Sequence, residues 1–124
     1  MLGGFDWGRL GDVLACVRAG RRLDYQGTDF DGAPYDWRFD EELPAVLIVE
    51  GVRLLRPEFA GYFDLTVWIE CPLEVAAARG KERDRAEGAD DAHLAIWDRE
   101  WAPKDHEYFE AYRPDRLADL LYSS

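Results

Sequence analysis

Three charged side chains of this sequence have types and spacings that could bind a small anion or a metal ion. Arg79 and Arg83 are four residues apart, so they share one face of any helix that contains them. Planar guanidinium groups on such a face can bind a small anion. Glu50 directly follows an apolar run, and a carboxylate can hold Mg²⁺ directly or through water. The simpler interpretations are salt bridges on a solvated helix for the arginines and exposure to solvent for Glu50.

The elements that must position these side chains are predicted from apolar runs. Residues 44–49 and 65–69 are continuous aliphatic and β-branched runs, as strands covered on both faces would be. Pro72 follows the second run at the point where a helix through Arg83 is expected to begin. Strand, short crossover, strand and helix in this order predict a right-handed parallel arrangement with ligands at the carboxyl ends of the strands. Glu50 occupies such an end.

Weaker signals predict the other elements. Apolar residues at helical spacing from Trp7 to Val17 predict a helix that Asp6 caps and Gly20 ends. Residues 21–43 lack a sustained period, so we expect a long excursion that contains one short strand and faces a ligand. The remaining expectations are a helix around residues 94–101, a break or restart at Pro103, a stop at Arg113-Pro114 and a final short strand within residues 117–122.

The composition is globular and excludes several classes of protein. Of the 124 residues 48% are hydrophobic and 33% are charged, which excludes disorder and low complexity. No apolar run approaches the roughly 20 residues of a membrane span, and the start lacks a secretory signal, so the cytoplasm is the expected location. Cys16 and Cys71 have neither zinc-site nor disulfide spacing and are expected to be reduced.

The excess of acidic over basic residues limits the kinds of molecule that this protein is expected to bind. The net charge of −11 argues against nucleic acids and anionic membranes. The basic residues are 13 arginines and 2 lysines, and a local arginine cluster can still bind a small anion.

Short blocks spread over nearly the whole chain carry a resemblance to a known family. They are Phe5-Asp6-Trp7, Arg18-Ala19-Gly20, Thr28-Asp29-Phe30, Val46-Leu47-Ile48-Val49-Glu50-Gly51, Leu54-Leu55, Tyr62-Phe63-Asp64-Leu65-Thr66-Val67-Trp68-Ile69, Pro72, Arg79, Arg83-Asp84, Tyr108, Pro114 and Ala118-Asp119. In this order they resemble the uridine kinase-type nucleoside kinases of the P-loop superfamily, which also holds phosphoribulokinase and pantothenate kinase.

The resemblance implies a fold, a reaction and a site. The fold is a three-layer α/β structure with a parallel sheet, and the reaction is ATP-dependent transfer of phosphate to a nucleoside 5′-hydroxyl with Mg²⁺. Arg79 and Arg83 would be catalytic residues acting on the phosphates, Asp29 and Phe30 would bind the acceptor, and Glu50 would assist Mg²⁺. The simpler interpretation of Asp29 and Phe30 is an Asx-turn beside an aromatic residue anchored in the core.

The sequence departs from this family at its start. The family opens with a strand, a GxxxxGK[ST] loop and a helix, soon followed by a catalytic Asp, and neither the loop nor that Asp is found here. The single Gly-Lys pair, Gly80-Lys81, is followed by Glu82. We therefore expect one partial, N-terminally truncated domain over residues 1–124, a lid-like segment at about 79–91, and no turnover by the chain alone.

Two other functions stay open. One is a non-catalytic, degenerate kinase that acts as a binding or oligomerisation module, because a lost central strand leaves backbone groups open to pairing. The other is a kinase of the same superfamily with a different small-molecule acceptor. The expected partners are a nucleoside and ATP, with a homo-oligomer among the alternatives.

Overall fold

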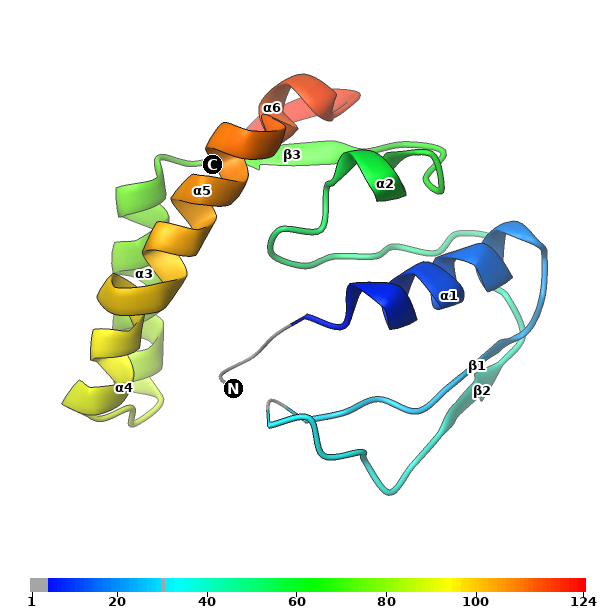
Figure 1. Ribbon diagram of the computed structural model, residues 1–124, viewed down its shortest axis with the longest axis horizontal. Coiled ribbons are helices and arrows are strands. Elements are labelled where there is room, and N and C mark those ends of the chain that lie inside the picture. The colour runs from blue at the N-terminus through cyan, green and yellow to red at the C-terminus, as the bar shows by residue number, and fades with distance from the viewer. Residues whose placement is uncertain (1–4, 30) are drawn as a thin grey trace. The chain divides into compact units, whose positions relative to one another are not determined.

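Residues 5–29 and 31–124 are described by a computed structural model (Figure 1). Contacts within the chain group into two units, Met1–Glu50 and Gly51–Ser124, called unit 1 and unit 2 below.

Unit 1 begins with helix α1, Trp7–Arg18. Asp6 caps it, since its carboxylate accepts a hydrogen bond from the backbone N–H of Arg9 at 2.9 Å. The helix buries Leu14 and ends before Gly20, whose φ of +69° places it in the left-handed region that glycine tolerates. The predicted helix, its cap and its end are confirmed.

The excursion after α1 contains two short strands. Strands β1 (Leu23–Tyr25) and β2 (Phe39–Glu41) pair antiparallel, and Tyr25 lies opposite Phe39. Leu23 is the buried residue of the pair. One strand was expected here, and the second appears because a strand needs a hydrogen-bonded neighbour, which residues 39–41 provide.

The segment expected to be the central strand of a parallel sheet forms no strand. Residues 44–50 carry no strand assignment, and no described residue pairs with them. Val46 is 76% exposed and Ile48 is 84% exposed, where burial on both faces was expected. An apolar run becomes a strand only when a neighbour satisfies its backbone groups.

Unit 2 is built around a parallel pair of strands. Strands β3 (Val67–Glu70) and β4 (Leu120–Ser123) are joined through a long helical connection, as parallel strands require. Its elements are α3 (Leu73–Ala86), α4 (Asp91–Ile96), the π-helical turn η1 (Trp97–Trp101), α5 (Ala102–Tyr112) and α6 (Pro114–Leu117), and the short helix α2 (Pro57–Ala60) precedes β3. Figure 1 shows α3 and α5 side by side, and contacts between them agree.

Several expectations for this half of the chain are confirmed. Pro72 stands directly before α3, and β4 is the predicted final strand. Pro103 lies in the first turn of α5, where its missing N–H is tolerated. Arg113 ends α5 with a φ of +45°, directly before Pro114.

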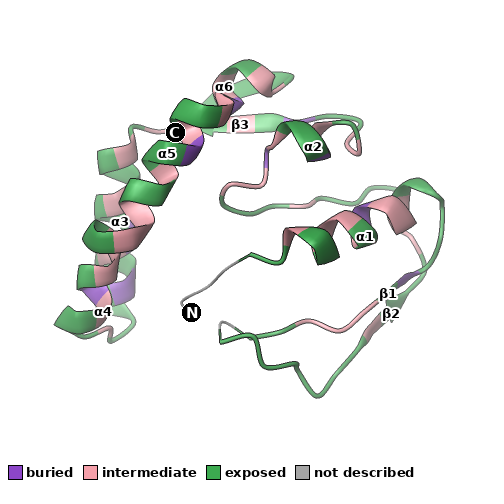
Figure 2. Ribbon diagram, viewed as in Figure 1, coloured by how far each residue is buried: buried purple, intermediate pink, exposed green. Residues whose placement is uncertain are grey.

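The core of unit 2 lies between β3 and α5. Trp68 of β3 packs against Tyr108 and Phe109 of α5, with ring centroids 6.4 and 6.0 Å apart. Phe59 of α2 is buried, and Tyr108, also buried, donates its hydroxyl hydrogen to the carbonyl of Leu55. Figure 2 shows that fully buried residues, in purple, are few.

The predicted three-layer, parallel-sheet P-loop fold is therefore wrong for this structure. The described residues form a small mixed α/β arrangement with two sheets of two strands each, one antiparallel and one parallel. The physical reason is the segment at 44–50, which lacks the neighbouring strand that would extend either sheet. Within residues 5–29 and 31–124, no helix is both long and apolar enough to cross a membrane.

Candidate functional site

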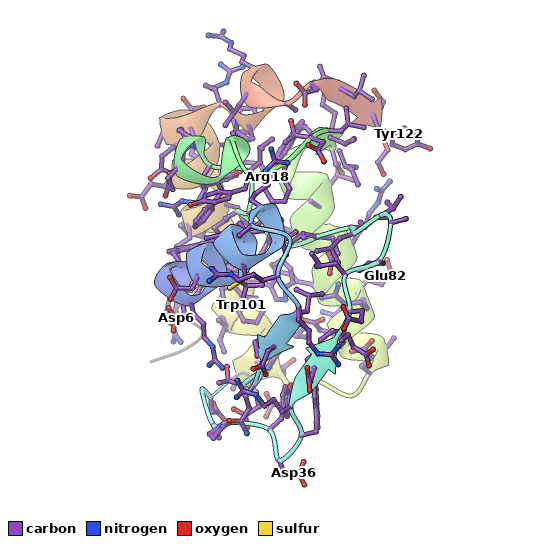
Figure 3. All side chains as sticks on the ribbon, turned by 90° about the vertical axis from the view of Figure 1, so that its right-hand side faces the viewer. Asp6, Arg18, Asp36, Glu82, Trp101 and Tyr122 are labelled. Atoms are coloured by element: carbon purple, nitrogen blue, oxygen red, sulfur yellow. The ribbon has the colours of Figure 1, made fainter. Side chains whose placement is uncertain are left out.

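A concavity with a volume of about 500 Å³ lies within unit 1. Its walls come from α1, from β1 and the residues after it, from β2 and from the segment that ends at Glu50. The lining residues are Asp6, Arg9, Leu10, Val13, Leu14, Val17, Leu23, Tyr25, Gln26, Gly27, Thr28, Phe39, Leu47, Ile48, Val49 and Glu50. We call it the unit 1 pocket; Figure 3 labels Asp6 and Arg18 at the two ends of α1.

One side of the unit 1 pocket is aromatic. Tyr25 and Phe39 face each other across the antiparallel pair, with ring centroids 5.3 Å apart and planes inclined by 20°. The apolar face of α1, including Leu10 and Val13, supplies another side. An apolar enclosure with a few polar groups is the usual character of a small-molecule site.

Two of the polar groups of the pocket are bound within unit 1. The Asp6 carboxylate caps α1, and the Arg9 guanidinium donates to the backbone carbonyl of Gln26. The Gln26 amide donates in turn to the carbonyl of Tyr35 at 2.5 Å. These hydrogen bonds hold the N-terminal end of α1 against the residues that follow β1.

Glu50 differs from these groups because its carboxylate makes no hydrogen bond or ion pair with the described residues, and it is exposed at the margin of the pocket. It lies at the pocket together with Thr28, which belongs to one of the sequence blocks quoted above. A free carboxylate at the edge of an apolar concavity can accept hydrogen bonds from a ligand or bind a cation that the ligand carries.

Asp29 has a different local role. Its carboxylate accepts hydrogen bonds from the backbone N–H groups of Asp31 at 3.0 Å and Ala33 at 2.8 Å. This is an Asx-turn, in which the side chain shapes its own loop. Asp29 does not line the unit 1 pocket, and Phe30 lies outside the described residues.

The two arginines lie on α3 of unit 2, in different environments. Arg79 donates to the Ser124 hydroxyl at 3.1 Å and lies 3.7 Å from the Cys71 sulfur, with no described carboxylate in ion-pair range. Arg83 binds its neighbour Asp84 at 2.8 Å, and this hydrogen bond raises the pKa of Arg83 above its ordinary value. Arg79 is thus the arginine left available to an anion.

Asp84 connects three helical segments, a role that was not predicted from the sequence. Besides Arg83, its carboxylate accepts from the Trp97 indole at 2.8 Å and lies 3.4 Å from the His93 imidazole. The Trp97 hydrogen bond, followed by the Arg83 guanidinium, holds the pKa of Asp84 below its usual range, although burial acts in the opposite direction.

The Trp97 ring also lies directly over Gly80 of α3. A Cβ at residue 80 would be 2.3 Å from the Trp97 ring, so only glycine fits there. The signal in the sequence was the glycine inside a helical pattern, which marks a close approach. The segment expected to be lid-like, residues 79–91, contains the end of α3, a turn with Gly88 at a φ of +96°, and the start of α4.

The described residues offer few side chains that could bind a metal ion together. Within the described part of the chain, no three His, Cys, Asp or Glu side chains gather in a way that could hold a metal ion. Mg²⁺ commonly uses one or two carboxylates, with waters and substrate phosphates completing the shell. Glu50 therefore fits Mg²⁺ only as one ligand of an ion that a nucleotide brings with it. A comparison of the sequence with models of known protein families finds no match.

Proposed function

We propose that this chain supplies the acceptor site of an ATP-dependent nucleoside kinase, with the nucleoside in the unit 1 pocket. The observation that carries the proposal is the pocket itself, which combines a stacked aromatic pair, an apolar wall and a free carboxylate at its margin. The sequence blocks that resemble uridine kinase-type enzymes supply the reaction class.

The dimensions and chemistry of the pocket favour a nucleoside over a purely apolar ligand. Its volume of about 500 Å³ lies within the range of small-molecule sites. Tyr25 offers a ring on which a base can stack, and stacking accepts any base. Thr28 offers a hydroxyl to the ribose hydroxyls.

Phosphate transfer needs more than this chain contains. Backbone amides and a Lys must hold the β- and γ-phosphates, with Mg²⁺ bridging them. The sequence has no GxxxxGK[ST] pattern, so we propose that transfer takes place when a second polypeptide segment supplies one. Glu50, at the margin of the acceptor pocket, would then bind the nucleotide-borne Mg²⁺.

The first experiment measures acceptor binding by the full chain. Saturation-transfer NMR with uridine and cytidine reports contact, and Tyr25→Ala is expected to weaken binding about 10-fold because a stacked base is lost. The matched control is Trp37→Ala, which removes an exposed aromatic ring that does not line the unit 1 pocket. Absence of nucleoside binding, or equal effects of both substitutions, contradicts the proposed acceptor site.

The second experiment measures transfer. The chain is mixed with a strand–loop–helix polypeptide that contains GxxxxGK[ST], and uridine phosphorylation is followed with Mg²⁺ and ATP. Glu50→Gln is expected to lower the rate of the reconstituted mixture, and it leaves the fold intact because Glu50 binds no described residue. If uridine binds and no mixture transfers phosphate, the kinase assignment fails while the acceptor site stands.

A further inference from the structure

The side-chain amide of Gln26 is held at its nitrogen and free at its oxygen. Gln26 follows β1 and lines the unit 1 pocket. Its side-chain nitrogen donates to the backbone carbonyl of Tyr35 at 2.5 Å, and because a carbonyl only accepts hydrogen bonds, the atom that faces it is the nitrogen. The amide oxygen of Gln26 makes no hydrogen bond with the described residues. Gln26 therefore offers a ligand of the pocket a hydrogen-bond acceptor of set orientation.

The backbone around Gln26 is also held in place. The Arg9 guanidinium of α1 donates to the Gln26 carbonyl, and the Tyr35 N–H donates to the carbonyl of Gly27 at 2.9 Å. A Cβ at residue 27 would lie 3.0 Å from the Tyr35 ring, so glycine allows this ring to approach the segment closely. The contacts that orient Gln26 and the walls of the pocket thus belong to the same unit.

The residues beside Gln26 indicate which part of a nucleoside it meets. A second concavity of about 220 Å³ adjoins the unit 1 pocket, and both Tyr25 and Gln26 line the two concavities. Thr28, whose hydroxyl is assigned to the ribose above, lines the unit 1 pocket and not the second concavity. A base stacked on the Tyr25 ring lies at the shared wall, where the polar group beside it is the Gln26 amide.

The edge of a nucleobase supplies the hydrogen that the free amide oxygen lacks. Uracil carries an N–H at N3, cytosine carries an exocyclic amino group, and an amide oxygen accepts a hydrogen bond from either. A ring without such a donor can still stack on Tyr25, but it leaves the Gln26 oxygen unpaired and displaces the water that would otherwise bind it. An unpaired polar group costs affinity, so this oxygen can distinguish between ligands of the same size.

We propose that the Gln26 amide oxygen accepts a hydrogen bond from an N–H on the base edge, which for uridine is the N3–H, and that this bond makes Gln26 a specificity-determining residue. The inference rests on the proposed acceptor site. Stacking on Tyr25 accepts any base and contributes affinity without selectivity. Gln26 adds a contact that depends on the chemistry of the base edge.

A comparison of uridine with 3-methyluridine tests the proposal. The two nucleosides differ only at N3, where a methyl group replaces the hydrogen, so both can stack and both carry the same ribose. NMR titration of the full chain is expected to give a dissociation constant about 10-fold lower for uridine, since the analogue loses one hydrogen bond. This comparison uses the wild-type chain, so its result does not depend on how a variant folds.

Substitutions assign the preference to Gln26. Gln26→Leu removes the polar atoms of the side chain and is expected to bind uridine and 3-methyluridine within about 2-fold of each other. The matched control is Thr28→Val, which removes the hydroxyl assigned to the ribose and is expected to weaken both nucleosides equally, so that uridine stays preferred. Gln26→Leu also loses the hydrogen bond to Tyr35, so far-UV circular dichroism checks its fold, and Gln26→Met takes its place if it does not fold.

The outcomes separate this inference from the proposed function. If the wild-type chain binds neither nucleoside, the acceptor site and the role of Gln26 both fail. If it binds uridine and 3-methyluridine equally well, the acceptor site stands and the role of Gln26 is wrong. A preference for uridine that persists without the Gln26 amide also overturns the inference, because another group must then contact N3.

Discussion

Replacement of Gly80 by alanine is expected to destabilise unit 2, although the same change stabilises most helices. Gly80 lies inside α3, where Gly→Ala ordinarily gains about 1 kcal/mol of helix stability. The added Cβ, however, would lie 2.3 and 2.4 Å from two atoms of the Trp97 ring. The ring or the helix must therefore move.

The Trp97 ring is held on two sides, so moving it has a cost. Its indole N–H donates to Asp84 at 2.8 Å, and its ring meets Trp101 edge to face with centroids 5.0 Å apart. Overpacking costs about 1–3 kcal/mol, and a lost hydrogen bond to a charged group costs about 1.5–3 kcal/mol. After the helix-propensity gain is subtracted, the net expected loss is about 2 kcal/mol of the free energy of unfolding.

Urea unfolding followed by far-UV circular dichroism measures this loss, and a double-mutant cycle assigns its cause. The atoms that clash belong to the six-membered ring of Trp97, so Trp97→Leu removes them. In that background Gly80→Ala is expected to regain its stabilising sign, a coupling of about 3 kcal/mol between the two residues. Ala78→Gly, at an exposed residue of α3, is the control and is expected to cost about 1 kcal/mol in both backgrounds.

If Gly80→Ala raises stability in the wild-type background, or has the same effect with and without the Trp97 ring, the close packing of α3 against η1 is not what the structure describes.

Three further predictions concern hydrogen-bonded polar side chains of unit 2. Asp84→Asn is expected to lower stability at neutral pH; because the folded-state pKa of Asp84 lies below its unfolded value of about 3.9, its contribution is present above that value and is lost as the pH falls through the folded-state pKa. Urea unfolding at several pH values should thus show wild type and variant converging in acid, and a constant difference contradicts the ion-pair role. Asp119→Ala is expected to lower the free energy of unfolding by about 2 kcal/mol, since the Asp119 carboxylate accepts hydrogen bonds from the backbone N–H of Thr66 at 2.8 Å and from the Thr66 hydroxyl at 3.0 Å. Thermal unfolding measures this loss, and an unchanged stability would show that these two hydrogen bonds do not stabilise the fold. Tyr108→Phe is expected to cost about 1 kcal/mol through the lost bond to Leu55. Burial raises the pKa of Tyr108 to about 12, so the stability it contributes is complete below pH 10 and is lost between pH 10 and 12; ultraviolet titration should find one tyrosine that ionises late, and uniform ionisation near 10 argues against its burial.

The sequence predicted the helices of this protein well because helix signals are local. Asp6 marks the start of α1, and Gly20 follows its end. Pro72 precedes α3, and Arg113-Pro114 separates α5 from α6. In each case the backbone groups of the helix are satisfied within the helix or by a cap a few residues away, so the deciding residues are near in sequence.

The candidate site was predictable only in part. Glu50 was expected at a ligand-facing position, and it lies at the margin of the unit 1 pocket. The aromatic pair of Tyr25 and Phe39 was missed, because thirteen residues without periodicity separate the two strands that bring them together. Asp84 was missed for a similar reason, since its partner Trp97 follows thirteen residues later on another helical segment.

Strand pairing is what the tertiary structure alone decided. Residues 44–49 and 65–69 are equally apolar in the sequence, and the same analysis predicted a buried parallel strand for each. Residues 67–70 form a strand because β4 returns beside them from fifty residues away, while the described residues provide no such neighbour for 44–49. A strand completes its hydrogen bonds with a segment that is distant in the sequence. An apolar pattern indicates that a segment tends to be buried, but it does not indicate whether such a partner segment is present.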